Sequence, residues 1–588
     1  PALAEYAVLR GSGSGAALTV SLEMHPHEVP PTRFSVDAFL TRGDFQWINQ
    51  DTGRRNTYPF TSMKTQAIAS ARKALAMGAV AVFAANKRGS QGAVGLAEEL
   101  ISQLSHALPM PVPADFVSAT KVDAAVKYLE AEYGATWVGT RALASGAVLH
   151  HGDIPQETRE VIEALLRHGD VRLAICTNTL AEGVNLPIRT LILYSVQRRH
   201  KGGLLENLLA RDIKNLVGRA GRAGATTKGL VICANEQQWP LVEQVARQTP
   251  GEPVHGALQS LVGRLREGLA LQNITLTNAI LDSTPELHTL VDGVDATLID
   301  LVAEEIGEDA LVAQAVLLAD QTFASIQSDS VSKKLLQNVF ELRARRVVGI
   351  RTAGRLGWIR ETGARARILD AVESDLLPRR STWDDLIDPI DPGFVSLILD
   401  WAWRQGELQQ AVRDAYRLDD DVDTNSVRQS LWDMVYAWLS GSRFQEVSRQ
   451  ANLEMDDILG VHTRVVSFVL QTLIEQGVAL LAKLLESQER ELAPAVLQFP
   501  EHLRFGVPTV PARILAASGV RHRNAAVELG RSLVNVGVTG DERSAVFSVA
   551  RESVLAYKDA WTDRLGLLVV DNTLSDLSSI IDENQRQD

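Results

Sequence analysis

The chain has 588 residues, enough for about three to five domains, and its apolar content of 45% is ordinary for a soluble protein with a packed core. It contains no run of about eighteen apolar residues and no signal-peptide pattern at its N-terminus, so we expect neither a membrane span nor a secreted protein. The net charge of −13 argues mildly against nucleic-acid binding, although local charge decides where a polyanion binds.

The first 60 residues are rich in proline and glycine and are expected to be irregular. Within them, Gly11 to Gly15 is expected to form a flexible loop, because no Lys-Ser/Thr pair follows as a phosphate-binding loop requires. From about residue 61 to residue 245, apolar stretches of strand length alternate with stretches of helical periodicity. This alternation predicts a parallel sheet covered by helices on both faces. The expected strands are residues 79–85, 147–150, 172–176, 190–194 and 229–233.

The two cysteines, Cys176 and Cys233, fall in two of these strands. Buried strand positions suit small apolar packing roles in a reducing cytoplasm better than a disulfide. No cluster of cysteine and histidine has the spacing of zinc ligands, so we expect no metal site of that kind.

Polar residues follow three of the expected strands directly, and ligands of such sheets bind at the carboxyl ends of the strands. Threonine hydroxyls at a strand end, beside outward-pointing backbone N–H groups, suit a nucleic-acid phosphate, and simple helix capping is compatible with that role. For the lysine and arginine after the first strand, phosphate contact and mere exposure are equal alternatives. The residues in question are Lys87 and Arg88, His150 and His151, and Thr177 and Thr179.

The stretch from Asn215 to Gly224 places Arg219 and Arg222 three residues apart, on one face of a short expected helix. Glycines on either side, including Gly218, leave the two guanidiniums unobstructed. Two adjacent guanidiniums suit the charge that develops on a transferring γ-phosphoryl group. The alternative is a pair of surface arginines at a helix end.

Residues 177–187, followed by residues 215–224, resemble motifs V and VI of superfamily 2 helicases, specifically of their Ski2-like branch. The resemblance implies that Arg219 and Arg222 act as catalytic arginine fingers on ATP. It also implies that His150 and His151 line a nucleic-acid path, and it places Lys87 and Arg88 at motif IV. The resemblance also implies that three residues lie near the nucleotide: Gly183, Asn185 and Gly218. The sequence has Asn215 where the family usually has glutamine, and the role of this residue stays open.

The first motor domain of such helicases carries a phosphate-cradling loop and an acidic Asp-Glu-x-His metal site, and this sequence shows neither. Asp541 and Glu542 stand in a turn-like context rather than at a strand end. The chain therefore resembles the C-terminal half of a helicase. The resemblance implies that most of the ATP and Mg²⁺ site lies on a first RecA-like domain, in cis or in trans. It also implies that the protein translocates along single-stranded DNA or RNA and unwinds duplexes.

On this interpretation, residues 1–60 link to the first motor domain and residues 61–245 form the second RecA-like domain. A mainly helical region follows. Residues 246–347 are expected to form a winged-helix-like domain and residues 348–495 a ratchet-like helical bundle. Residues 496–588 resemble a helix-hairpin-helix module with a tail, for which an ordinary pair of packed helices is the alternative.

Two further sets of residues allow alternative interpretations. The arginines between Arg343 and Arg367 suit either contact with a nucleic-acid backbone or ion pairs with neighbouring carboxylates, with equal weight. Five tryptophans suit core packing better than base stacking. They are Trp383, Trp401, Trp403, Trp432 and Trp438.

A rival to the helicase is a non-enzymatic nucleic-acid-binding or regulatory subunit with a degenerate helicase domain, or one half of a split helicase. The sequence leaves open DNA versus RNA, the oligomeric state, and whether a protein partner in repair, RNA turnover or antiviral defence is involved.

Overall fold

The computed structural model describes residues 4–587, apart from a set of short segments, and the chain divides into two compact units. Unit 1 comprises Pro1–Glu252, Arg443–Gln445 and Arg551–Ser578, and unit 2 comprises the remainder. The segments outside the described residues are 15–16, 27–32, 179–187, 200–204, 219, 221–228, 248–256, 273–274, 302–305, 420 and 541–542.

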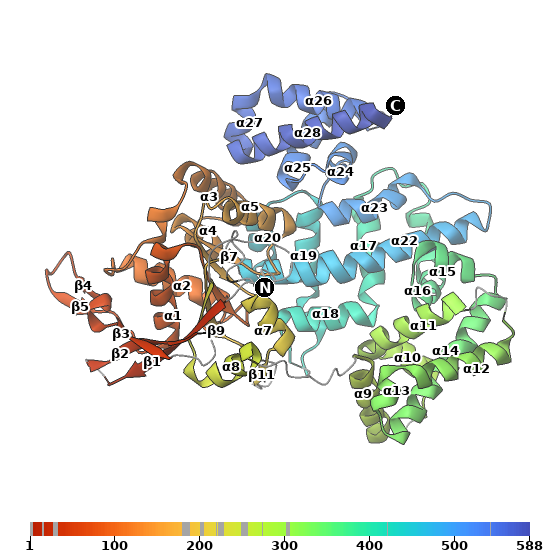
Figure 1. The fold of residues 1–588 in the computed structure, drawn as a ribbon. Helices are drawn as coiled ribbons and strands as arrows, with labels where there is room; N and C mark the ends of the chain where they lie inside the picture. The colour runs from red at the N-terminus through yellow and green to blue at the C-terminus, as the bar shows by residue number, and fades with distance from the viewer. Residues whose placement is uncertain are drawn as a thin grey trace. The chain divides into compact units, whose positions relative to one another are not determined.

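Unit 1 is built on an eight-stranded sheet with the order β3-β2-β1-β12-β9-β6-β8-β7 (Figure 1). From β1 to β7 in this order the strands are parallel, whereas β2 and β3 join antiparallel beyond β1. The central strands are apolar throughout because both of their faces are covered. The strands are β1 (Ala4–Ser12), β2 (Thr19–His25), β3 (Phe34–Leu40), β6 (Val80–Ala84), β7 (Ala147–His150), β8 (Leu173–Cys176), β9 (Thr190–Ser195) and β12 (Gly229–Cys233).

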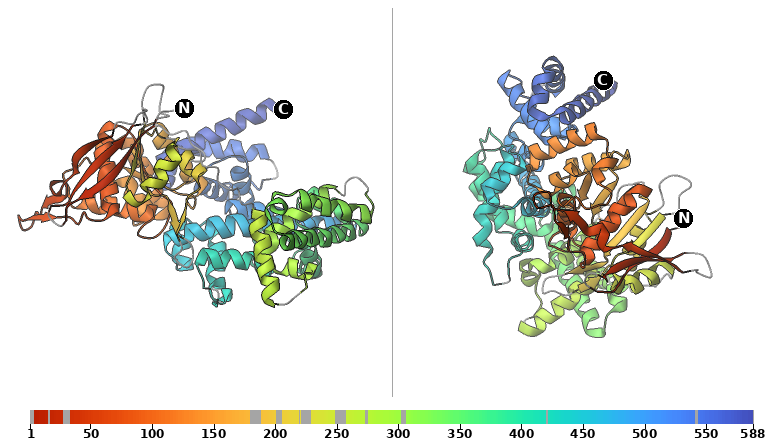
Figure 2. Two further views of the ribbon diagram at one scale, coloured as in Figure 1. Left: turned by 60° about the horizontal axis from the view of Figure 1, so that its bottom comes forward. Right: turned by 90° about the vertical axis from the view of Figure 1, so that its left-hand side faces the viewer.

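Helices connect these strands and pack against the sheet, as Figures 1 and 2 show. Each predicted strand between residues 79 and 233 is present within a residue or two, so the prediction of a helix-covered parallel sheet is confirmed. The helices are α1 (Met63–Ala74), α2 (Ala93–Ser105), α3 (Ala119–Tyr133), α4 (Val138–Ala144), α5 (Gln156–Arg167), α7 (Ala210–Val217) and α8 (Trp239–Arg247).

The expectation that residues 1–60 are irregular is wrong. Strand β1 lies parallel to β12, with Ala4 opposite Gly229 and Val8 opposite Cys233, so the N-terminal segment completes the sheet. Gly11, expected in a flexible loop, pairs with Val20 inside the β1–β2 ladder. The apolar run in β1 is only a few residues long, and neighbouring glycines and prolines conceal it when the sequence is read locally.

Arg72 of α1 is buried and holds the segment that follows α2. Its Nε donates to the carbonyl of Pro111 at 3.0 Å, and its Nη2 donates to the carbonyls of Leu108 and Met110 at 3.2 and 2.9 Å. Burial lowers the pKa of Arg72 to about 10.

We expect Arg72→Met to lower the free energy of unfolding by about 3 kcal/mol, because buried carbonyls lose their donor. Denaturant titration of both proteins would measure the loss. Lys121→Met is the control, because Lys121 is half exposed and its pair with Asp170 should contribute under about 1 kcal/mol. Equal effects of the two substitutions would contradict the structural role of Arg72.

The described residues of unit 2 form helices and include no strand, so the β-wing expected within residues 246–347 is not among them. The helices of the first part are α9 (Ala257–Gln272), α10 (Asn278–Ser283), α11 (His288–Leu301), α12 (Glu308–Gln321), α13 (Phe323–Gln327) and α14 (Ser330–Thr352). Those that follow include α15 (Leu356–Thr362), α16 (Ala366–Ala371), α17 (Pro392–Trp403), α18 (Gly406–Tyr416), α19 (Arg428–Leu439), α22 (Gln471–Glu486), α23 (Pro494–Phe505), α24 (Val510–Ala517) and α25 (Arg523–Asn535).

The predicted core role of the tryptophans is confirmed. All five are at most 8% exposed. Trp401 lies so close to Gly477 of α22 that a Cβ added there would stand 2.5 Å from the indole ring. The helix Met455–Glu486, which contains α22, is the one candidate span by length and composition in the described chain, but 56% of its apolar window is buried inside the protein. That burial is what a core helix shows.

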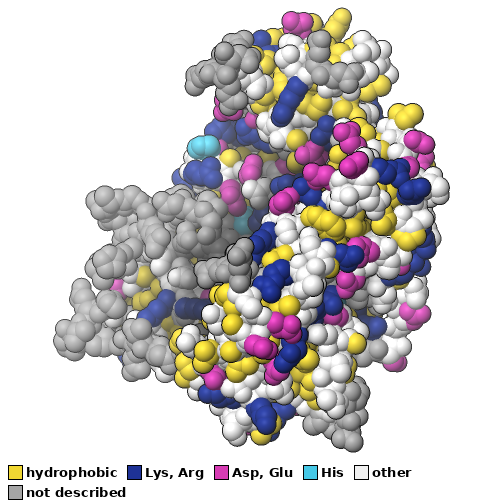
Figure 3. Space-filling model, turned by 90° about the vertical axis from the view of Figure 1, so that its right-hand side faces the viewer, with side chains coloured by type: hydrophobic (Ala, Val, Ile, Leu, Met, Phe, Trp, Pro, Cys, Tyr) yellow, Lys and Arg dark blue, Asp and Glu magenta, His cyan; other side chains and the backbone are white. Residues whose placement is uncertain are grey.

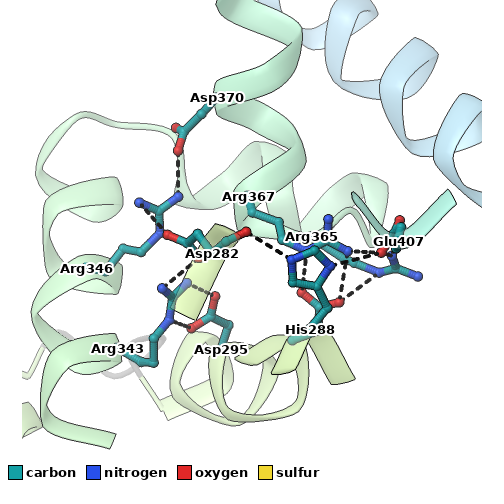
Figure 4. Close-up of polar contacts among 10 residues, drawn as sticks. Asp282, His288, Asp295, Arg343, Arg346, Arg365, Arg367, Asp370 and Glu407 are labelled. Carbon is teal, nitrogen blue, oxygen red and sulfur yellow. Dashed lines mark hydrogen bonds and ion pairs between the residues drawn. The ribbon is translucent and has the colours of Figure 1, made fainter. Parts of the chain in front are cut away.

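Most of the arginines between Arg343 and Arg367 form ion pairs, and Figure 4 shows those of Arg343, Arg346, Arg365 and Arg367, whereas Arg351 and Arg360 donate to backbone carbonyls. Arg343 is fully buried and forms a bidentate pair with Asp295, with N–O distances of 2.7 and 2.5 Å. It also donates a hydrogen bond of 2.9 Å to Asp282. Arg365 and Arg367 share Glu407. The ion-pair alternative is therefore confirmed for these three arginines. The alternative that the buried Arg343 contacts a nucleic-acid backbone is wrong.

The segment expected to resemble a helix-hairpin-helix module forms the helix pair α24 and α25. Arg523 at the start of α25 is buried and donates to the carbonyls of Gly506 and Trp438 at 2.9 and 3.0 Å. Its guanidinium also stacks 3.8 Å from the centre of the Trp438 ring. Arg523 thus fastens the pair to the core, and nucleic-acid binding by this module stays a prediction.

Candidate functional site at the carboxyl edge of the sheet

The neighbouring strands β6, β8 and β7 end at the same edge of the sheet. Phe83 of β6 and His150 of β7 both stand opposite Cys176 of β8. The backbone N–H of Thr177 donates to the carbonyl of His150 at 3.1 Å, which ties the first residue of motif V to the histidine pair. The loops after these three strands are therefore held together, as the sequence predicts for residues at the carboxyl ends of parallel strands.

Asp153, which the sequence analysis did not single out, connects two of these loops. Its carboxylate forms an ion pair with Lys87 and lies 3.5 Å from the Nη2 of Arg88. Asp153 is buried, and the two cations are mostly buried, so mere exposure of Lys87 and Arg88 is wrong. The ion pairs hold both cations at the edge where phosphates are expected. The sequence does contain a signal for Asp153, because it is an acidic residue only three positions after the strand end at His150.

The two histidines are buried below this edge. The Nε2 of His150 lies 2.9 Å from the carboxylate of Glu163 in α5. The Nδ1 of His151 accepts the backbone N–H of Asp153 at 3.3 Å, while its Nε2 has no hydrogen-bond partner among the described residues. In this structure the histidines shape the loop that presents Asp153, and a direct contact with nucleic acid stays a prediction.

Burial lowers the pKa of His151 to about 3, so the folded protein keeps this ring neutral. The unfolded chain takes up the proton near pH 6.5, and stability is therefore complete above pH 6.5 and falls as the pH drops toward 3. At pH 5, protonation of this one histidine in the unfolded chain should lower the free energy of unfolding by about 2 kcal/mol. His151→Asn should reduce the difference in unfolding free energy between pH 7.5 and pH 5 by that amount.

Urea titrations of both proteins at the two pH values provide the measurement. The values at pH 7.5 show what the substitution costs apart from protonation. His462 and His502, whose pKa values burial also lowers, act in both proteins and cancel. An unchanged difference between the two pH values would contradict the prediction.

The other predicted site residues divide into two groups. Thr177 is buried at the end of β8, and Gly218 caps the C-terminus of α7, with its N–H donating to the carbonyl of Lys214 at 2.8 Å. Asn215 is exposed on α7. The remaining ones lie outside the described residues: Thr179, Gly183, Asn185, Arg219 and Arg222. Among the described residues, no group of three or more His, Cys, Asp or Glu side chains is arranged to hold a metal ion.

Comparison with known proteins finds helicases that are similar to this part of the chain. Residues 119–224 match the helicase conserved C-terminal domain. The human Superkiller complex protein 2 is 34% identical over 108 residues, which cover 18% of this chain and 9% of that protein. The Hachiman protein HamB of Bacillus cereus is 33% identical over 117 residues, 19% of this chain and 10% of that protein. The ATP-dependent DNA helicase Hel308 of Aeropyrum pernix is 36% identical over 95 residues, 16% and 13% of the two chains.

The aligned part is thus a small share of each of these relatives. The part that matches the family model contains the strand ends that bear His150, Thr177 and Asp153, and it extends to the arginines that follow α7. Residues 119–224 therefore match a helicase conserved C-terminal domain, and over short stretches the chain is similar to Ski2-like superfamily 2 helicases, which supports the resemblance seen in motifs V and VI.

Proposed function

We propose that this chain supplies the second motor domain of an ATP-dependent helicase that translocates along single-stranded DNA or RNA. The observation that carries the proposal is the carboxyl edge of the sheet, where Lys87, Arg88 and Thr177 converge within the matched helicase domain or beside it. The first motor domain, in cis or in trans, would complete the nucleotide site and is expected to hold Mg²⁺. The residues of this chain that suit the nucleotide are Arg219 and Arg222.

Each group has a separate task in the proposed cycle. Bound ATP supplies the phosphoryl group, and Arg219 and Arg222 stabilise the negative charge that develops on it. Thr177 and Thr179 present their hydroxyl groups to a phosphate of the strand. Asp153 keeps Lys87 and Arg88 oriented, and a phosphate oxygen approaching the edge would compete with this carboxylate for them.

The helical bundle supports the proposal through a π-helix, His462–Leu470, inside the long helix 455–486. Such wide turns are rare and are frequent at functional sites. This one presents Arg464 on the surface and Phe468 with 71% of its side chain exposed. An exposed aromatic ring stacks on bases without sequence preference, so Phe468 would grip the strand while the motor domains reset. No periodicity in the sequence indicates this departure from α-helix.

The proposal places the protein in a reducing compartment such as the cytoplasm. Cys176 and Cys233 are both free and buried, and burial raises the pKa of each to about 12. A buried thiol with a raised pKa is unreactive, and neither cysteine forms a disulfide. This supports packing roles for both cysteines.

The test is ATP hydrolysis with and without single-stranded nucleic acid, measured on this chain and on this chain combined with the first motor domain. DNA and RNA strands of the same sequence, assayed in parallel, decide which substrate stimulates more. Stimulated turnover only in the combined protein is the expected result. Strand binding without turnover in either protein would overturn the proposal in favour of a regulatory nucleic-acid-binding subunit.

A further inference from the structure

A small β-hairpin projects from unit 1 away from its sheet (Figure 1). It consists of β4 (Gln46–Ile48) and β5 (Arg55–Thr57), paired antiparallel. The side chain of Asn49 accepts the backbone N–H groups of Asp51 and Thr52 at 2.9 and 3.0 Å. Gly53 adopts a φ of +63° and donates to the carbonyl of Asn49 at 2.8 Å. The turn is therefore fixed by its own hydrogen bonds, although nearly all of it is exposed.

The pairing register gives the hairpin two different faces. Trp47 stands opposite Asn56 and packs edge-on against His106 at 5.1 Å, so this face lies on the protein. Ile48 stands opposite Arg55 on the other face and is 59% exposed. Alternate residues of a strand share a face, so Thr57 accompanies Arg55 there.

Three arginines, each of them exposed, gather on this hairpin. Arg42 lies beside Thr57, with its Nε 3.4 Å from the hydroxyl, and Arg54 and Arg55 follow the turn. Within the described residues none of the three has a carboxylate partner. Two acids lie nearby: Asp44 at the hairpin base pairs with Lys73 at 2.8 Å, and Asp51 stands in the turn itself, so the three arginines outnumber the acids of the hairpin. By contrast, basic and acidic side chains are interspersed on the face of the molecule shown in Figure 3.

The hairpin lies at the amino ends of the parallel strands, opposite the candidate site. Helix α2 begins beside the loop after β6, where Ala93 donates to the carbonyl of Asn86, and it runs back across the sheet to His106. His106 contacts both Trp47 and Tyr58 at 5.1 Å. A strand bound at the carboxyl edge must therefore extend beyond that site before it can reach the hairpin.

We propose that this hairpin, defined by Arg42, Arg54 and Arg55 with Ile48 between them, is a second contact for the sugar-phosphate backbone of nucleic acid. Guanidiniums bind phosphate oxygens in a two-bonded geometry, and a rigid turn presents them without a large ordering cost. The apolar Ile48 would lie against a sugar. The inference rests on the proposed function, because it assigns a further contact to the same nucleic acid.

The experiment compares the full chain with the triple variant Arg42→Ala, Arg54→Ala, Arg55→Ala. Fluorescence anisotropy measures the affinity for a labelled strand of about 10 nucleotides, within the size of a single binding site, and for a strand about four times longer. For the long strand we expect at least about tenfold weaker binding by the variant at low salt. The slope of log affinity against log salt should fall in magnitude by about 2, because each of the three lost phosphate contacts contributes about 0.7 to it. The short strand should bind both proteins equally.

Two further variants separate charge from folding. The corresponding triple lysine variant keeps the charge and should retain most of the affinity for the long strand. Arg345→Ala is the matched control, because Arg345 is also exposed but already pairs with Glu341 and Glu308. Unchanged affinity and salt slope in the triple alanine variant would overturn the inference and leave the hairpin to a protein partner. Failure of the unaltered chain to bind either strand would instead overturn the proposed function.

Discussion

Replacing Arg222 with alanine is expected to reduce nucleic-acid-stimulated ATP turnover by about 10³-fold or more in the protein combined with its first motor domain. The reason is electrostatic: a guanidinium beside the transferring phosphoryl group neutralises charge that is greatest in the transition state. Strand binding should change little, because the residues proposed to hold the strand phosphates, such as Thr177 and Lys87, are left intact. Steady-state ATP hydrolysis with saturating single strand measures the effect.

Two variants sharpen this test. Arg222→Lys keeps the positive charge but loses the planar, two-bonded geometry, so most of the loss should remain. Arg211→Ala is the control, because Arg211 is largely exposed at the start of α7, near the same segment. Turnover by Arg222→Ala within a few-fold of the unaltered protein would show that Arg222 is only a surface residue at a helix end.

Replacing Arg343 with alanine should lower the free energy of unfolding by about 3–5 kcal/mol. The substitution leaves the carboxylate of Asp295, which is itself buried, without its two-bonded partner, and it removes the bond to Asp282 (Figure 4). Burial raises the pKa of Asp295 even with Arg343 present, so the uncompensated acid should take up a proton more readily than in the unfolded chain. The variant should therefore recover part of its lost stability as the pH falls from 8 toward 5.

Denaturant titration at both ends of this pH range provides the measurement. A double variant, Arg343→Met with Asp295→Leu, removes both charges together and should lie much closer to the unaltered protein, because no buried charge is left unpaired. Arg345→Ala, two residues further along α14, should cost less than about 1 kcal/mol, because both of its ion pairs are exposed. Equal losses for Arg343→Ala and Arg345→Ala would contradict the buried network.

The parallel sheet was predictable because its central strands are apolar at every position, as in Val80–Ala84 and Leu173–Cys176. Such strands need cover on both faces, and the helical stretches between them supply it. The N-terminal strand was not predictable in this way. Its place beside β12 depends on pairing between residues more than two hundred positions apart, which no local pattern records.

The sequence by itself determined which residues stand at the carboxyl ends of the strands, because chain order and strand direction fix those positions. It also predicted the apolar role of the tryptophans, which the structure confirms, and a motif VI role for Arg219 and Arg222, which stays a prediction. Only the tertiary structure decided which partners the charged side chains meet. Asp153 reaches Lys87 across two loops, Arg343 reaches Asp295 from another helix, and Arg55 meets no carboxylate among the described residues. An ion pair depends on distance and burial in space, and spacing along the chain fixes neither of them.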